Sequence, residues 1–379
     1  MIVPSGDELA RAATLLNASK KTTILAGAGV EGAHDEVIAL ADRLGAPIVH
    51  ALRGKEFIEY DNPFDVGMTG LLGFASGYRA MEAADTLLVL GSDFPYEQFY
   101  PEHATTIQVD IRGSQLGKRH PLDLGLVGDV RATADALLPR LAEKSDRDHL
   151  DDSTAHYRKT RAKLDDLATP TKAGRPIHPQ YLARLLDEQA ADDAVFTADV
   201  GSPTVWAARY LSMTENRRLI GSFTHGSMAN ALLHGIGAQV SHPDRQVIAL
   251  AGDGGLAMML GELLTLTQNK LPVKTIVVNN SSLNFVELEM KAAGFVNYGT
   301  ALDNPSFAAI AEAMGIFARR VENSEDLPDA VREVLAHDGP ALLDVVTERQ
   351  ELSMPPAIEA AQVKGFALYA IRTVMSGKG

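Results

Sequence analysis

The sequence contains no cysteine, which excludes disulfide bonds and metal sites built from thiolates. It also lacks any apolar run of about 18 residues, so no transmembrane helix is expected. Basic residues number 35 against 49 acidic ones, and the net charge of −14 opposes general electrostatic binding to nucleic acid or to an anionic membrane. The first residues, MIVPSGDELARAA, lack the basic and apolar regions of a signal peptide. A cytoplasmic location and no nucleic-acid partner are therefore expected.

Two series of short apolar segments alternate with helical patterns along the 379 residues. The apolar segments are TTILAGAG, APIVHAL, DTLLVLGSD, TTIQVDI and LGLVGDV in the first series, and AVFTADV, RLIGSF, QVIALAGDGG, VKTIVVNN and ALLDVVT in the second. This alternation predicts an α/β fold with two successive doubly wound parallel-sheet domains. The predicted parts are a first domain over 1–143, a charged linker with one solvated helix over 144–176, a second domain over 177–353 and a helical tail over 354–379.

Two polar sequences in the second series fall where strands end. LAGDGG contains Asp253, and VVNNSSL contains Asn280 one helix and one strand later. Because parallel strands end at one edge of a sheet, both side chains are expected at the edge where ligands bind. Glycines there let backbone N–H groups approach a diphosphate, and Mg²⁺ prefers a few protein oxygens together with phosphate oxygens. A Gly-Asp-Gly turn alone is ordinary turn chemistry, so the prediction depends on the pair.

This pair resembles the signature of thiamine-diphosphate enzymes. The resemblance implies that Asp253, Asn280 and the carbonyl of Ser282 bind Mg²⁺. In FTHGSMANALLHGIGAQ it implies that Met228 holds the cofactor in its bent V shape. The implied thiamine diphosphate contacts are Gly201, Ser202, Gly226, Ser227, Met228, Asp253, Gly254, Gly255, Asn280, Ser282, Leu283, Asn284 and Phe285.

Longer segments look like the quinone-linked pyruvate dehydrogenases, also called pyruvate oxidases. They are VHALRGKEFIEYDNPFDVGMTGLLGF, GSDFPYEQFYP, IHPQYLARLL, PTVWAARYL and MPPAIEAAQVKGFALYAIRTVMSGKG. By this resemblance the first domain binds FAD and the second binds thiamine diphosphate. The implied FAD contacts are Thr69, Gly70, Leu71, Leu72, Gly73, Ser92, Asp93, Phe94, Pro95, Tyr96 and Asp110. The GAG turn at 27–29 is not a full GxGxxG and predicts a generic dinucleotide site only weakly.

The resemblance implies oxidative decarboxylation of pyruvate to acetate and CO₂. Electrons would pass through thiamine diphosphate and FAD to a membrane quinone, and Phe285 would assist their transfer to the flavin. The family's enzyme is a homotetramer bound peripherally to the inner face of the cell membrane. Asn284 stands where the family usually has glycine, although asparagine also tolerates left-handed backbone geometry.

Some parts of the family pattern have no counterpart in this sequence. The family begins with another α/β domain whose glutamate contacts the aminopyrimidine, and no acidic residue here matches it. We expect that domain to be supplied in cis or in trans, and the chain alone to have little or no activity. In the bacterial family an amphipathic lipid-binding segment follows the matched region, so lipid-dependent regulation is expected to be absent or altered.

Two alternatives to the oxidase remain open. The first is an acetolactate-synthase-like carboligase, in which FAD is largely structural. The second is a noncatalytic cofactor-binding fragment. The segments FPYEQFY and KGFALY favour the oxidase, whereas the unmatched first domain favours the fragment for the isolated chain.

Overall fold

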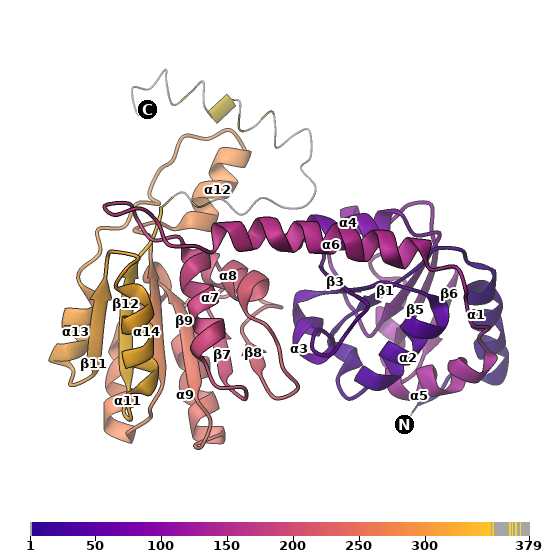
Figure 1. Cartoon of the computed structure of the whole chain (residues 1–379), viewed down its shortest axis with the longest axis horizontal. Coiled ribbons are helices and arrows are strands. Elements are labelled where there is room, and N and C mark those ends of the chain that lie inside the picture. Colours follow the sequence, from indigo (N-terminus) through magenta and orange to yellow (C-terminus); the bar gives the residue numbers. More distant parts are fainter. Residues whose placement is uncertain are drawn as a thin grey trace. The chain divides into compact units, whose positions relative to one another are not determined.

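Parallel strands form two separate six-stranded sheets, which confirms the predicted α/β fold (Figure 1). The structure is a computed structural model that describes residues 2–349 and, beyond them, Glu351, Lys364, Phe366, Leu368, Tyr369 and Arg372. The chain divides into two compact units, the first built mainly from residues 2–164 and the second mainly from 165–212 and 216–349. Each unit contains one of the sheets.

The first unit has the strand order β3-β2-β1-β4-β5-β6. Its strands are β1 (Thr22–Ala26), β2 (Ile48–His50), β3 (Asp65–Met68), β4 (Thr86–Leu90), β5 (Thr105–Asp110) and β6 (Leu124–Val127). Its helices are α1 (Gly6–Ala18), α2 (His34–Leu44), α3 (Lys55–Ile58), α4 (Ala75–Glu82) and α5 (Val130–Leu137). The order reverses between β1 and β4, and such a reversal opens a crevice at the carboxyl ends of the strands.

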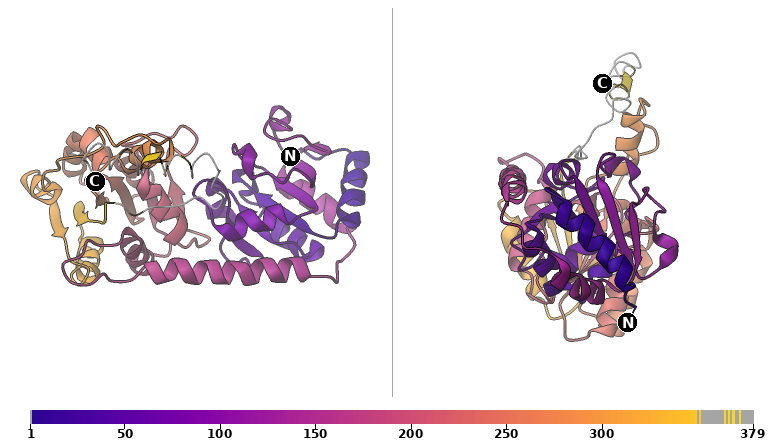
Figure 2. Two further views of the ribbon diagram at one scale, coloured as in Figure 1. Left: turned by 90° about the horizontal axis from the view of Figure 1, so that it is seen from above. Right: turned by 90° about the vertical axis from the view of Figure 1, so that its right-hand side faces the viewer.

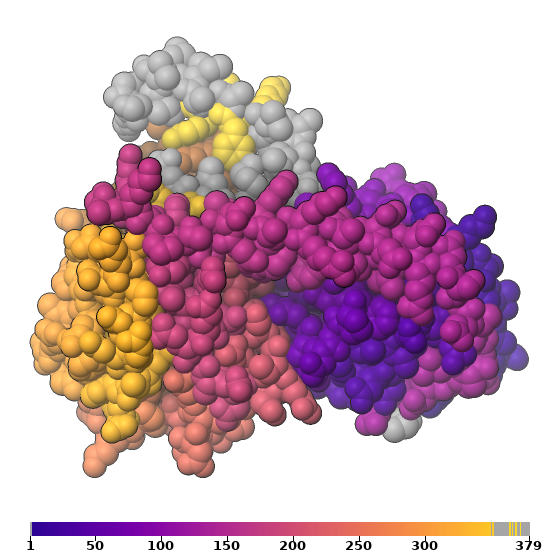
Figure 3. Space-filling view, in the orientation of Figure 1, coloured from indigo at the N-terminus to yellow at the C-terminus, as the bar shows by residue number. Residues whose placement is uncertain are grey.

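The predicted solvated helix of the linker is α6 (Asp148–Leu167), which Figure 2 shows as one long helix. Its buried residues lie only near its start, at His149, Leu150 and Ser153. His149 Nε2 lies 2.9 Å from Thr23 Oγ1 in β1, which ties this end of the helix to the first unit. The rest of α6 lies at the surface, as Figure 3 shows, because its sequence is dominated by charged residues.

The second unit has the strand order β11-β12-β10-β9-β7-β8. Its strands are β7 (Val195–Ala198), β8 (Arg218–Ile220), β9 (Val247–Gly252), β10 (Lys274–Asn279), β11 (Phe317–Val321) and β12 (Ala341–Val346). Its helices are α7 (Pro179–Gln189), α8 (Ser202–Tyr210), α9 (Ala231–Ser241), α10 (Asp253–Met258), α11 (Leu263–Asn269), α12 (Asn284–Ala292), α13 (Phe307–Ala313) and α14 (Leu327–Ala336). The order reverses between β7 and β9, so a ligand crevice is expected where these two strands end.

The predicted helical tail over 354–379 lies outside the described residues, apart from the five residues between 364 and 372 named above. No helix in the part of the chain that the structure describes is both long enough and apolar enough to cross a membrane.

Candidate functional site

Asp253 lies at the carboxyl end of β9, where it begins α10, and only 3% of its surface is exposed. Its Oδ1 accepts a hydrogen bond from the backbone N–H of Gly254 at 2.8 Å. Its Oδ2 accepts one from the N–H of Ser281 at 2.7 Å. Burial raises the pKa of Asp253 above its ordinary value, although these donors favour the ionised form. The carboxylate thus joins the ends of two neighbouring strands, and a cation bound there would offset the cost of its burial.

Asn304, in the loop before α13, holds the same carboxylate. Its Nδ2 donates to Asp253 Oδ2 at 2.8 Å and to Asn279 Oδ1 at 2.9 Å. Asn279 in turn donates to Asp344 Oδ1 at 2.9 Å, and Arg320 Nη1 donates to Asp344 Oδ2 at 2.6 Å. This chain of bonds fixes Asp253 against β10, β12 and β11. Asn304 was not predicted as a site residue, because one asparagine in a loop carries no periodicity or motif.

The loop after β10 contains the other predicted metal ligands. Asn280 Oδ1 accepts from the N–H of Ser282 at 3.0 Å, and Ser281 has a left-handed φ of 55°, which is uncommon for a residue with a side chain. A second loop braces this backbone, because Leu283 donates to the Thr300 carbonyl at 2.8 Å. The hydrogen bond from Ser281 to Asp253 brings the two predicted ligand segments to the same place.

The described residues contain no group of three or more His, Cys, Asp or Glu side chains placed to hold a metal. A cation at this edge would therefore depend on one carboxylate, one amide oxygen and backbone carbonyl oxygen. That set, completed by phosphate oxygens, suits Mg²⁺ and not a softer metal. The oxygen atoms that Asp253, Asn280 and Ser282 offer are thus of the kinds that Mg²⁺ binds.

Two helices begin beside this edge without a side-chain cap. The N-cap of α8 is Gly201, with a φ of 144°, and the N-cap of α12 is Leu283. The first N–H groups of a helix have no partner within it and carry partial positive charge. The starts of α8, which includes Ser202, and of α12 are therefore suited to bind a diphosphate.

Asp199, which was not among the predicted site residues, directly follows β7 and joins it to the end of β9 and the start of α9. Its Oδ1 accepts from the N–H of Ala231 at 2.8 Å and its Oδ2 from the N–H of Gly252 at 3.1 Å. A Cβ at Gly255 would lie only 2.1 Å from Asp199 Oδ2. Gly255 is therefore required for the close approach of α10 to the end of β7.

Met228 lies at the surface of the site and not in the core, since 38% of it is exposed. A Cβ built at Gly254 would lie 2.9 Å from Leu283 Cδ2, 3.3 Å from Leu302 Cδ1 and 3.6 Å from Met228 Cε. These apolar side chains form a wall over Gly254. The exposed Gly226, with a φ of 75°, has no atom within 4 Å of the position of a Cβ, so the space beside it is open.

The other predicted thiamine diphosphate contacts of the second unit lie in the same segments as Met228 and Leu283. Ser227 is half-buried, and its carbonyl accepts from Asn230 Nδ2 at 2.6 Å. Phe285 is half-buried in the first turn of α12. Asn284 is helical, and its Nδ2 donates to the Arg349 carbonyl at 2.9 Å. The left-handed geometry that a family glycine at this position allows is therefore not used here.

The predicted FAD contacts lie in loops at the carboxyl ends of β3, β4 and β5. Thr69 Oγ1 is buried and has no hydrogen-bond partner within the described part of the chain. Gly70 has a φ of 93°, and a Cβ there would lie 2.9 Å from Phe94 Cε2 and 3.2 Å from Tyr96 Cδ2. The 69–73 and 92–96 segments therefore pack together, with Leu71 exposed and Asp93 accepting from Arg119 Nε at 3.1 Å.

Two further features limit how a dinucleotide would bind to the first unit. Asp110 is buried, and its Oδ1 accepts from the N–H of Arg112 at 2.8 Å. The N–H groups of Gly27 and Gly29 donate to the carbonyls of Leu90 and Gly91, both at 2.9 Å. The GAG turn therefore closes against the loop after β4, and the N–H groups of its two glycines are already used.

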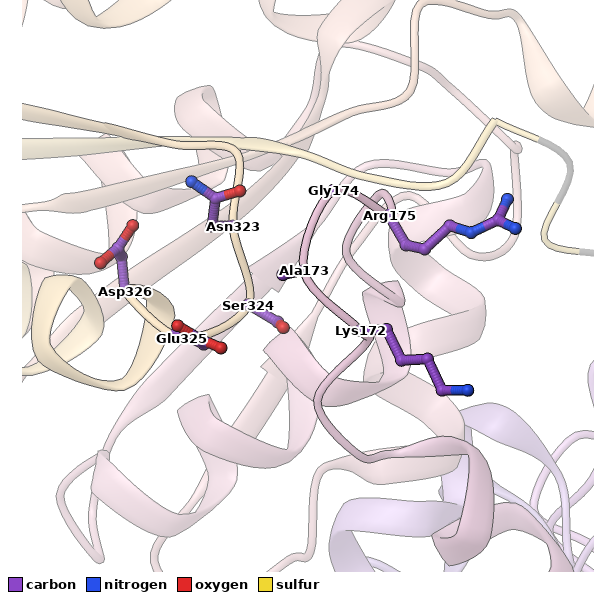
Figure 4. A pocket seen from close by; sticks show the side chains of 8 residues that line it. All are labelled: Lys172, Ala173, Gly174, Arg175, Asn323, Ser324, Glu325 and Asp326. Carbon is purple, nitrogen blue, oxygen red and sulfur yellow. The ribbon is translucent and has the colours of Figure 1, made fainter.

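A separate surface depression in the second unit lies between the end of the linker and the loop after β11 (Figure 4). It is lined by Lys172, Ala173, Gly174, Arg175, Asn323, Ser324, Glu325 and Asp326. Figure 4 shows the charged ends of Lys172 and Arg175 pointing away from the 323–326 loop. The side chains do not converge on a common point, and none of them belongs to the site at β7 and β9.

Comparisons with known proteins match both units. The family model for the thiamine pyrophosphate enzyme central domain matches residues 9–137, and the one for the C-terminal TPP binding domain matches residues 199–345. The chain is 36% identical over 369 residues to the thiamine pyrophosphate-containing protein YdaP of Bacillus subtilis, covering 97% of this chain and 64% of that protein.

Two named enzymes are also similar to the chain. The acetolactate synthase large subunit of Porphyra purpurea is 30% identical over 375 residues, covering 95% of this chain and 63% of that protein. The pyruvate oxidase of Lactiplantibacillus plantarum is 28% identical over 349 residues, covering 90% of this chain and 58% of that protein. The chain thus spans less than two thirds of the length of these relatives, and their identities do not separate an oxidase from a synthase.

Proposed function

Because this chain belongs to the thiamine pyrophosphate enzyme superfamily, whose central and C-terminal domains it contains, we propose that it uses thiamine diphosphate and Mg²⁺ to decarboxylate pyruvate. The observation that carries the proposal is the hydrogen bond from Ser281 to Asp253. It brings the carboxylate after β9 and the loop after β10 together, beside the point between β7 and β9 where the strand order reverses.

Different residues of the chain would bind the metal ion, the diphosphate and the rings of the cofactor. Asp253, the Asn280 side chain and the Ser282 carbonyl would bind Mg²⁺, and the N–H groups that begin α8 and α12 would bind the diphosphate. Met228 and Leu283 would support the rings and exclude water from the reacting edge. When bound, thiamine diphosphate supplies the electron sink that decarboxylation of a 2-keto acid requires.

We further propose that the first unit binds FAD and that the reaction is oxidative, giving acetate and CO₂. Three features support this. They are the strand order of the first sheet, the buried Thr69 hydroxyl, which has no hydrogen-bond partner among the described residues, and the aromatic segment with Phe94 and Tyr96 that packs on Gly70. Electrons would then pass from FAD to a membrane quinone, with Phe285 assisting transfer to the flavin. On this proposal the enzyme works at the inner face of the cell membrane.

A carboligating enzyme that makes acetolactate is the second candidate. Its support is the acetolactate synthase of Porphyra purpurea, which is 30% identical to the chain over 375 residues, against 28% over 349 residues for the pyruvate oxidase. Both candidates share the site in the second unit. They differ in the fate of the decarboxylated substrate, so product analysis separates them.

We also propose that a pyrimidine-binding domain, in the same or another polypeptide, covers the site, and that the assembly is a homo-oligomer. Large apolar side chains near the site support this. Leu233, Met258, Val286 and Phe295 are 39%, 63%, 44% and 58% exposed. Leu233, Met258 and Val286 lie on α9, α10 and α12, and Phe295 follows α12; large apolar side chains exposed on helices that begin at the strand ends are typical of a surface that another domain covers.

The decisive experiment adds pyruvate, thiamine diphosphate and Mg²⁺ anaerobically to the FAD-loaded protein together with the pyrimidine-binding domain. The oxidase proposal predicts loss of the visible flavin absorbance and formation of acetate. Acetolactate with an unchanged flavin spectrum would establish the carboligase instead. Neither product, in a protein that binds both cofactors, would refute both enzymes and leave a cofactor-binding protein.

A further inference from the structure

Glu287 lies in the first turn of α12 as a buried carboxylate, with only 2% of its surface exposed. Its Oε1 accepts from Lys291 Nζ at 2.8 Å and from Asn297 Nδ2 at 2.8 Å. Its Oε2 accepts from Ser282 Oγ at 2.7 Å, and Arg349 Nη2 lies 3.5 Å away. Both oxygens are therefore satisfied, which a buried carboxylate requires.

The ion pair with Lys291 is also buried, since the side chains of Glu287 and Lys291 are 3% and 7% exposed. Burial opposes ionisation of Glu287, but the hydrogen bonds from Lys291 and Ser282 outweigh it and hold the pKa of Glu287 below its ordinary value. The carboxylate thus has the cationic Lys291 Nζ on one oxygen and the Ser282 hydroxyl on the other, and a hydrogen bond to a carboxylate paired in this way is charge-assisted.

That hydroxyl belongs to the loop after β10. Ser282 has its N–H bonded to Asn280 Oδ1 and its Oγ bonded to Glu287, so both its backbone and its side chain are held. Ser281 beside it has the left-handed backbone that costs free energy in a residue other than glycine. A strained loop keeps such a conformation only where its surroundings fix it, and Glu287 is one of the groups that do so.

The opposite side of the same ion pair contacts the C-terminal segment. Lys291 Nζ lies 5.4 Å from the ring centroid of Tyr369, and Arg372 Nη1 donates to the Gly294 carbonyl at 2.6 Å. Lys291 thus connects the loop after β10, through Glu287, with a residue far along the chain. Figure 1 shows α12 projecting beyond the sheet.

We propose that Glu287 is a positioning residue that fixes the Ser281–Ser282 loop so that its oxygen ligands are ready for Mg²⁺. The inference rests on the proposed function, which makes the Ser282 carbonyl a metal ligand. Groups that orient metal ligands are typically worth about 10- to 100-fold in metal affinity. A role confined to the stability of α12 would not change that affinity when the ion pair is intact.

Ser282→Ala is the variant that separates these roles, because it removes the hydroxyl but keeps the backbone carbonyl and the Glu287–Lys291 pair. Ser282→Thr keeps the hydroxyl and is the rescue variant. Glu287→Gln removes the charge itself. Glu289→Gln is the matched control, since Glu289 is exposed on the same helix. All four variants are made in the full chain.

Two measurements are made on each variant. Hydrogen–deuterium exchange of the ligand-free protein reports how firmly the 281–283 backbone is held. Titration of Mg²⁺ at a fixed excess of thiamine diphosphate, followed through the fluorescence of the single tryptophan Trp206 in α8, gives the metal affinity.

We expect faster exchange over 281–283 and about 10- to 100-fold weaker Mg²⁺ affinity in Ser282→Ala and Glu287→Gln, with both effects absent in Ser282→Thr and Glu289→Gln. Wild-type exchange in Ser282→Ala, or wild-type Mg²⁺ affinity in both Ser282→Ala and Glu287→Gln, would overturn the proposal. If the unaltered chain bound no thiamine diphosphate, the proposed function would fail. The exchange rates would then still decide whether Glu287 positions the loop.

Discussion

Replacing Asn304 by alanine tests the chain of hydrogen bonds behind Asp253. The amide nitrogen of Asn304 donates to Asp253 Oδ2 at 2.8 Å and to Asn279 Oδ1 at 2.9 Å, and alanine can make neither bond. The substitution leaves Asp253 with backbone N–H donors, those of Gly254, Ser281 and Asn280 among them. The carboxylate therefore stays buried but is less well satisfied.

The size of the effect follows from these two bonds. A hydrogen bond to a charged group contributes about 1.5–3 kcal/mol, and one between neutral groups contributes about 0.5–1.5 kcal/mol. We therefore expect Asn304→Ala to lower the free energy of unfolding of the second unit by about 2–4 kcal/mol. Because Asp253 is also a proposed ligand, the affinity for Mg²⁺ with thiamine diphosphate should fall by about 10- to 100-fold.

Urea unfolding followed by fluorescence reports on the second unit, because the only tryptophan, Trp206, lies in its helix α8. Asp303→Asn is the matched control, since Asp303 is the exposed neighbour of Asn304 in the same loop. The control should change the free energy of unfolding by less than about 0.5 kcal/mol. An Asn304→Ala protein as stable as the control would refute the role assigned to Asn304.

Three other substitutions probe buried groups and glycines. Burial, and to a smaller extent the nearby charge of Glu59, raise the pKa of Asp65 to about 7. Because the unfolded chain ionises this carboxyl more easily than the folded chain does, the first unit loses stability as the pH rises from about 4 to 7. Between pH 5 and pH 8 the ionisation of Asp65 should lower the free energy of unfolding by up to about 3 kcal/mol, and Asp65→Asn should remove this fall. Calorimetry at several pH values measures it, and an unchanged pH dependence in Asp65→Asn would contradict the assignment. Gly255→Ala places a Cβ 2.1 Å from an oxygen of Asp199 and should destabilise the second unit by about 1–3 kcal/mol in urea unfolding. At Gly237 in α9 no atom lies within 4 Å of the position of a Cβ, so Gly237→Ala should instead stabilise that unit by up to about 1 kcal/mol. Equal effects of the two glycine substitutions would contradict the packing described here.

Alternation of apolar segments and helical patterns was sufficient to predict both sheets, because most strands are buried on both faces and read as continuous apolar runs. Two strands were missed. β3 has the sequence DVGM, which is short and contains glycine, and it lies at one edge of its sheet. β11 has the sequence FARRV at the edge of the second sheet, where its arginines reach solvent, so no apolar run marks it.

The site was partly predictable for a similar reason. Asp253 and Asn280 directly follow strands, so the topology alone places them at one edge. Asn304 and Glu287 reach that edge through loop closure and helix packing, which leave no local pattern in the sequence. The sequence also did not show that the GAG turn at 27–29 is closed. Its glycines pack against Gly91 and do not form an open loop that could bind phosphate.

The central claim is that Asp253 and the loop after β10 form a Mg²⁺-dependent site for thiamine diphosphate. The most direct test is isothermal titration of thiamine diphosphate into the unaltered chain and into Asp253→Ala, each with Mg²⁺ and with a chelator. We predict binding to the unaltered chain that requires Mg²⁺ and is lost in Asp253→Ala. Binding that persists with the chelator, or equal affinity in Asp253→Ala, would contradict the account.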